Sequence, residues 1–160
     1  MPRAVEDPLD IYFLQSDTVL ARSILECARL KPVAAFSIPQ SAPTSRMVGD
    51  FLIPAGSNFV VDTHALNIRN PFWGDDSTQY RPERFVSCTP SQMRYHYWRY
   101  GFGPRQCLGK YLVDLIIKVI VVHLVEDRRL SFTAMTHWDK NPESWIAQAT
   151  TDLHWEQLER

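Results

Sequence analysis

The stretch Tyr100-Gly-Phe-Gly-Pro-Arg-Gln-Cys-Leu-Gly109 is the most informative part of this sequence. It places Cys107 behind a loop of Gly and Pro residues, two positions after Arg105 and just inside the start of a predicted helix. The first N–H groups of a helix lack intrahelical acceptors and carry a positive partial charge, so they favour a thiolate over a thiol. Gly109 has no side chain, which would let a flat group approach the helix closely.

Other loop motifs fail on the same residues. A phosphate-binding loop needs four residues between its glycines and a Ser or Thr after its lysine. Here Gly103 and Gly109 enclose five residues, and Tyr111 follows Lys110. A cysteine phosphatase loop would need an arginine where Val113 stands. The chemistry of this stretch is therefore that of the cysteine itself.

Two charged motifs precede the cysteine loop. Residues 17–30 are predicted to form a helix, because apolar residues recur at helical spacing after the possible N-caps Asp17 and Thr18. Within this helix, Glu26-Cys-Ala-Arg29 puts a carboxylate and a guanidinium group on one face. The second motif, Pro82-Glu83-Arg84-Phe85, lies in a region rich in turn residues.

Taken together, these motifs resemble the C-terminal portion of the cytochrome P450 family. The cysteine loop matches F-x-x-G-x-R-x-C-x-G with Tyr100 in place of Phe, and the two charged motifs match E-x-x-R and P-E-R-F in the right order. The resemblance covers about residues 15–135, and residues 59–69 and 95–124 look most like fungal secondary-metabolism members. A tyrosine at position 100 adds a hydroxyl that needs a hydrogen-bond partner.

The resemblance implies a haem-thiolate site that binds haem b. It makes Cys107 the axial ligand of the haem iron and the catalytic residue, and it pairs Arg105 with a haem propionate. Gly103 would permit the tight turn, Phe102 would shield the sulfur from water, and Gly109 would leave room for the porphyrin. Backbone N–H groups after the cysteine would tune its potential.

The resemblance also implies a structural triad of Glu26, Arg29 and Arg84. Glu26 and Arg29 would meet Arg84, which is distant in the sequence, in one buried hydrogen-bonded network. Removing one member of such a network leaves an uncompensated buried charge, which costs roughly 3–5 kcal/mol.

The implied activity is that of a monooxygenase, an oxidoreductase that inserts one oxygen atom from dioxygen into a small organic substrate. Its electrons would come from an NADPH-dependent reductase, and its context would be fungal secondary-metabolite biosynthesis. The sequence matches only the C-terminal part of such proteins, so residues 1–160 are predicted to be a single partial domain, the haem-proximal half. Two alternatives follow: a catalytically inactive truncated remnant that lacks the oxygen-activating helix, or a haem-binding module that needs a partner chain.

Composition excludes several other classes. Lys plus Arg is 17 and Asp plus Glu is 18, a net charge of −1 that argues against a nucleic-acid-binding protein. Three cysteines without a C-x-x-C pair argue against a disulfide framework or a zinc ribbon. The longest apolar run, residues 111–125, is interrupted by Asp114, Lys118 and His123, so no membrane span is expected. The expected location is the cytosol for this chain alone, and the cytosolic face of the endoplasmic-reticulum membrane for a full-length relative.

The expected fold is mainly α with a minor β portion. After the helix at 17–30, apolar runs between Val33 and Val61 predict a small antiparallel sheet, and residues 64–69 a short helix. An irregular meander over residues 71–107 leads to the helix that follows the cysteine loop. That helix is predicted to have a solvated polar stripe (Lys110, Asp114, Lys118) and an apolar face (Leu112, Leu115, Ile116, Val119, Ile120). Residues 130–133 and 146–155 would be closing strands.

Overall fold

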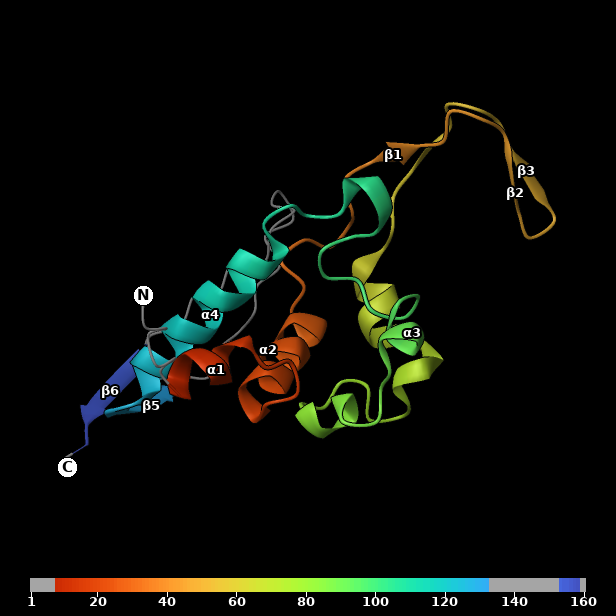
Figure 1. Cartoon of the computed structure of the whole chain (residues 1–160). Coiled ribbons are helices and arrows are strands. Elements are labelled where there is room, and N and C mark those ends of the chain that lie inside the picture. Colours follow the sequence, from red (N-terminus) through yellow and green to blue (C-terminus); the bar gives the residue numbers. More distant parts are fainter. Residues whose placement is uncertain (1–7, 133–152, 159–160) are drawn as a thin grey trace, which may run out of the picture.

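The computed structural model describes residues 8–132 and 153–158, and it confirms a mainly α fold with short antiparallel strand pairs (Figure 1). The helices α1 (Pro8–Leu14), α2 (Val19–Leu30) and α4 (Lys110–Val125) lie near one another at one end. A meander of short helical turns lies on the other side of α2, and a hairpin projects away from the helices. The cysteine loop joins the meander to α4.

The predicted helix over residues 17–30 is confirmed as α2. Thr18 is its N-cap, and its hydroxyl oxygen accepts a hydrogen bond from the Ala21 N–H at 3.1 Å. The helix ends at Leu30, two residues before Pro32, because a residue that precedes a proline disfavours helical geometry. Ala21, Glu26 and Arg29 form its buried face.

The predicted small sheet consists of two separate strand pairs. β1 (Gln40–Ser41) pairs with β4 (Asn58–Phe59), and β2 (Arg46–Val48) pairs with β3 (Phe51–Ile53), both antiparallel. The expectation of a strand at Val33–Phe36 is wrong, because this segment has isolated bridges at Ala34 and at Phe36, which pairs with Asp62, and no continuous strand. Thr63 binds two carbonyls of this segment: the Thr63 hydroxyl donates to Ala34 and Ala35, and the Thr63 main-chain N–H also donates to Ala35.

The meander is largely irregular, as the sequence predicted. The predicted short helix is η1 (Ala65–Arg69), which has π rather than α hydrogen bonding. The 3-10 turns η2 (Pro71–Trp73) and η3 (Pro82–Phe85), the one-turn helix α3 (Pro90–Met93) and the 3-10 turn η4 (Gly103–Arg105) follow. Three aromatic rings form its centre, with ring centroids 5.8 Å apart for Trp73–Phe85 and for Phe85–Tyr97, and 6.2 Å apart for Trp73–Tyr97.

The second predicted helix is α4, but it begins at Lys110, so Cys107 lies before the helix rather than just inside it. The Cys107 N–H donates to the Tyr100 carbonyl at 2.9 Å, and Gly109 is the N-cap residue. The main chain of the cysteine therefore belongs to the loop, which closes on itself through this hydrogen bond.

The polar stripe of α4 does not form the solvated face that was expected. The ammonium group of Lys118 donates to the carbonyls of Phe13 and Gln15, both at 2.7 Å, because the last carbonyls of α1 have no intrahelical donors. The apolar face is instead left open to solvent, with exposed fractions from 37% for Leu115 to 62% for Leu112.

Two strands follow α4. β5 (Arg128–Phe132) pairs antiparallel with β6 (Leu153–Gln157), in agreement with part of the predicted closing strands. The rest of that prediction, residues 133 and 146–152, lies outside the described residues. Over the described ranges, α4 and the other helices are all too short or too polar to cross a membrane.

Replacing Thr18 tests whether its side chain stabilises the N-terminus of α2. Thr18→Ala should lower the free energy of unfolding by about 1 kcal/mol, because the Ala21 N–H loses its acceptor. Thr18→Ser keeps the oxygen and should stay close to wild type. Urea denaturation followed by circular dichroism measures both, and equal losses for the two variants would contradict the capping role.

A buried charge network beside the Cys107 loop

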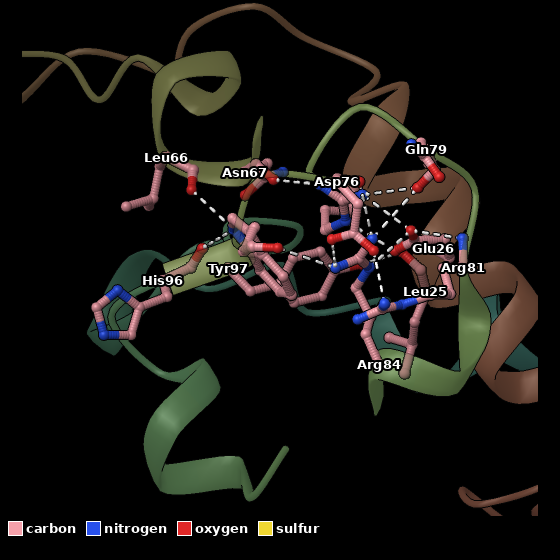
Figure 2. Close-up of polar contacts among 12 residues, drawn as sticks. Leu25, Glu26, Leu66, Asn67, Asp76, Gln79, Arg81, Arg84, His96 and Tyr97 are labelled. Atoms are coloured by element: carbon pink, nitrogen blue, oxygen red, sulfur yellow. Dashed lines mark hydrogen bonds and ion pairs between the residues drawn. The ribbon is translucent and has the colours of Figure 1, made fainter. Parts of the chain in front are cut away.

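The structure brings the triad residues Glu26, Arg29 and Arg84 together. Arg29 lies one turn after Glu26 on α2, and the exposed fraction of both side chains is 0%. The Arg29 guanidinium donates through Nε to Glu26 Oε2 at 2.7 Å and through Nη2 to Oε1 at 2.8 Å, a bidentate pair. Arg84 from η3 donates through Nε to Glu26 Oε1 at 2.9 Å. Figure 2 shows Glu26 beside Arg84 and Arg81.

Most of the remaining contacts of both guanidinium groups are to carbonyls of the meander, and Arg84 Nη1 also lies 3.4 Å from the Asp76 carboxylate. Arg29 Nη1 donates to the Asn67 carbonyl at 2.9 Å. Arg84 donates through Nη1 to the Trp73 carbonyl at 3.1 Å and through Nη2 to the Asp76 carbonyl at 3.2 Å. A buried carbonyl without a partner is costly, so these contacts hold an irregular segment in one conformation.

Glu26 stays ionised in this environment. Burial alone would raise the pKa of its carboxyl group, but hydrogen bonds from Arg29, the Arg81 N–H and Arg84 outweigh burial and lower it from the ordinary value of 4.5. The carboxylate therefore remains deprotonated and forms ion pairs with both Arg29 and Arg84.

Trp73 is a site residue that the sequence reasoning missed. Its ring lies 4.9 Å from the Arg29 guanidinium carbon, and its side chain is only 3% exposed. Its indole Nε1 donates to the carbonyls of Leu66 and His96, each at 3.1 Å. The sequence does not indicate these contacts, because they join Trp73 to residues from four other segments.

A second polar cluster attaches the cysteine loop to α4. The Tyr100 hydroxyl donates to Asp114 Oδ1 at 2.9 Å, so Asp114 is the partner that the hydroxyl needed. Arg99 Nη2 lies 2.7 Å from the same oxygen. Burial, followed by the hydrogen bond to Asp114, raises the pKa of Tyr100 to about 12, so the phenol remains a donor at neutral pH.

The predicted haem-contacting residues all lie on this loop and at the entry to α4. Cys107 and Arg105 are exposed, and within the described residues Arg105 forms no ion pair. Gly103 has a φ of 63°, which L residues rarely adopt, and a Cβ there would meet nothing within 4 Å. Phe102 packs edge-on against Trp98, with ring centroids 5.0 Å apart. At Gly109, a Cβ would meet only Val113, at 3.9 Å.

These features fit a haem group. Over residues 8–132 and 153–158, no three His, Cys, Asp or Glu side chains gather as a metal site, so Cys107 could hold iron only if the other ligands came with it. A porphyrin brings four nitrogen ligands and two carboxylates. The loop offers one sulfur, one guanidinium group that has no ion-pair partner among the described residues, and open space at Gly103 and beside Gly109.

The fold and the site thus define a haem-thiolate protein. The model of the cytochrome P450 family matches residues 8–154, and this chain belongs to that family. Members hold haem iron through a cysteine thiolate, so haem-thiolate iron is the cofactor that the membership implies.

Relatives agree with this assignment. The chain is 54% identical to the cytochrome P450 monooxygenase aclC of Aspergillus oryzae, over 86% of this chain and 29% of that protein. It is 44% identical to gliC of Aspergillus fumigatus, over 89% of this chain and 28% of the relative. The chain therefore spans less than a third of the length of these relatives.

Solved structures show the same fold. A cytochrome P450 (CYP102L1) aligns with a TM-score of 0.72 at 20% identity, covering 86% of this chain and 31% of the other. A zebrafish cytochrome P450 solved with progesterone aligns with a TM-score of 0.71 at 22% identity, over 86% and 31%.

Removing one arginine of the triad should be strongly destabilising. Arg84→Ala leaves Glu26 with one cation and several carbonyls without donors, so we expect a loss of ~3–5 kcal/mol in the free energy of unfolding. The matched control is Arg69→Ala, whose ion pair with Asp62 is exposed and should contribute at most ~1 kcal/mol. Guanidinium denaturation measures both, and similar losses would contradict the role of the buried network.

The Glu26 carboxylate should also make stability depend on pH. Because its folded pKa is lowered, its contribution is fully present above the unfolded value, near 4.5, and is lost as the pH falls through the folded pKa. The wild type should therefore exceed Glu26→Gln in stability at neutral pH, and this advantage should shrink in acid. Denaturation curves of both proteins, measured from neutral pH down to below pH ~4, test this expectation. A difference in unfolding free energy that does not change with pH would contradict it.

Proposed function

We propose that this chain is the haem-proximal part of a monooxygenase that inserts one oxygen atom from dioxygen into a small organic substrate. The observation that carries the proposal is the exposed side chain of Cys107 on a loop whose main chain is fixed by the hydrogen bond to Tyr100. The electron donor would be an NADPH-dependent reductase. Relatives from Aspergillus and Penicillium that are named monooxygenases support a context in fungal secondary metabolism.

Cys107 would hold the iron through its sulfur. A thiolate ligand supplies the electron density that favours O–O cleavage on bound haem. Within the described residues, the N–H groups of Leu108 and Gly109 have no backbone acceptor, so both are free to donate to the sulfur. Such donors lower the basicity of a thiolate ligand and tune its potential.

Arg105 would orient the haem. Its side chain is exposed and forms no ion pair among the described residues, and it lies two positions before the cysteine. A guanidinium group binds a carboxylate through two parallel hydrogen bonds, which fixes direction as well as distance. A haem propionate is the carboxylate that would reach this position.

The exposed apolar face of α4 indicates that further polypeptide packs against this part of the chain. Leu112, Ile116 and Ile120 are 62%, 46% and 51% exposed, and a contiguous apolar surface of this kind marks an interface. We propose that further polypeptide covers this face and forms the distal side of the haem site. It would come from the remaining length seen in the relatives or from a partner chain, and a chain that never meets it would be an inactive remnant.

Substitution of the ligand tests the proposal. After reconstitution with haem, reduction and addition of carbon monoxide, the chain should show the red-shifted Soret band of thiolate ligation. Cys107→Ala should abolish that band, because no other described cysteine lies in the loop. The matched control, Cys88→Ala, should keep it, since burial raises the pKa of the Cys88 thiol and favours its protonated form. A histidine-type or free-haem spectrum in the wild type would overturn the proposal.

A further inference from the structure

Asn67 is a fully buried polar residue in η1 that neither the motifs nor the proposed function explains. Its exposed fraction is 0%. Its amide Nδ2 donates to the Trp98 carbonyl at 2.8 Å, and its Oδ1 accepts from the Trp98 N–H at 2.7 Å. One side chain thus satisfies both main-chain groups of a residue 31 positions away, as a neighbouring strand would.

The main chain of Asn67 is held by a different residue. Its carbonyl accepts from Arg29 Nη1 at 2.9 Å, and Arg29 is fixed in turn by its bidentate pair with Glu26. Figure 2 shows Asn67 next to the charge network. Asn67 is therefore bonded to the triad through its backbone and to the segment before the cysteine loop through its side chain.

Trp98 transmits its position to the cysteine loop by two routes. It lies two residues before Tyr100, whose carbonyl accepts the Cys107 N–H at 2.9 Å. Its ring also packs against the loop itself, edge-on to Phe102 and close to Gly101, where a Cβ would lie 3.7 Å from the indole. A shift of the Trp98 main chain would therefore move the main chain at Cys107.

We propose that Asn67 is a positioning residue for the iron ligand and carries the geometry of the buried triad to Cys107 through Trp98. This proposal rests on the proposed haem-ligand role of Cys107. Asn67 does not act on the substrate or the sulfur directly. Its effect is to hold the main chain of the Cys107 loop, and therefore the sulfur, in one conformation.

A merely stabilising residue would behave differently, and Thr63 provides the comparison. Thr63 is 3% exposed, and its hydroxyl donates to the carbonyls of Ala34 and Ala35, at 2.6 and 2.9 Å. Like Asn67, it binds the main chain about thirty residues away, but within the described residues no hydrogen bond joins its partners Ala34 and Ala35 to the cysteine loop. Thr63→Val therefore removes buried hydrogen bonds without touching the path from the triad to Cys107.

Amide hydrogen exchange in the haem-free chain is the first experiment. Asn67→Leu keeps the approximate volume and removes both hydrogen bonds to Trp98. The amides of Trp98 and Cys107 should then exchange at least about tenfold faster than in wild type, the factor that corresponds to about 1.4 kcal/mol. In Thr63→Val, these two amides should keep their protection relative to the α2 amides, even where the whole chain is less stable.

Haem ligation is the second experiment. In Asn67→Leu reconstituted with haem, we expect the thiolate-type fraction of the carbon monoxide complex to fall at least about threefold, because the cysteine is no longer held in position. Thr63→Val should retain the wild-type fraction. Asn67→Asp keeps an oxygen that can accept from the Trp98 N–H, but it replaces the donor with a carboxylate oxygen that repels the Trp98 carbonyl, so its fraction should also fall below that of wild type.

The outcomes separate this proposal from the proposed function. If the wild type shows no thiolate band, the haem proposal fails and this one fails with it, whatever the exchange data show. If the wild type shows the band and Asn67→Leu retains both the band and the protection at Cys107, the role of Asn67 alone is overturned. Equal effects in Thr63→Val would also overturn it. If Asn67→Leu does not fold, Asn67→Asp decides between the same outcomes.

Discussion

The buried carboxylate of Glu26 is the constraint on which the rest of the described structure depends. It accepts hydrogen bonds from two guanidinium groups and one main-chain N–H, and it lies at the meeting point of α2, η3 and the segment before η3. An isolated buried carboxylate is costly, and so is an isolated buried guanidinium group. Each charge is therefore stable only when the others are in place, which selects one arrangement of α2 and the η3 region, which are far apart in the sequence.

This arrangement explains how a meander with little regular structure can present a defined site. Backbone carbonyls in an irregular segment have no ladder of partners, and here the arginines supply donors to Asn67, Trp73 and Asp76. The conformation is then passed to the cysteine loop from two sides. Asn67 holds the main chain of Trp98, and Asp114 on α4 holds the side chain of Tyr100. The loop itself needs little secondary structure, because Trp98 just before it and Tyr100 at its start are both held by hydrogen bonds.

Some of these features could be predicted because their physical cause is local. Thr18 caps a helix through an oxygen three residues from its donor, and a proline limits the same helix at its other end. The need of the Tyr100 hydroxyl for a partner followed from the residue type alone, but the identity of that partner, Asp114, did not. The errors have non-local causes. Val33–Phe36 has strand-like composition, yet it forms only isolated bridges, and Thr63 binds two of its carbonyls. Lys118 was expected to face solvent, yet its ammonium group binds two carbonyls at the C-terminal end of α1.

The sequence by itself determined the family, the cysteine that would hold iron, and the identities of the three charged residues, because these depend on residue type and spacing along the chain. Tertiary structure decided which other residues contact the three charged residues and the cysteine loop. The roles of Trp73 and Asn67 arise only when η1, η2 and the residues around Trp98 come together, since a hydrogen bond between positions 67 and 98 leaves no periodic pattern in the sequence. It also decided that Cys107 lies in the loop before α4, because the hydrogen bond to Tyr100 closes the loop and the helix begins only after Gly109.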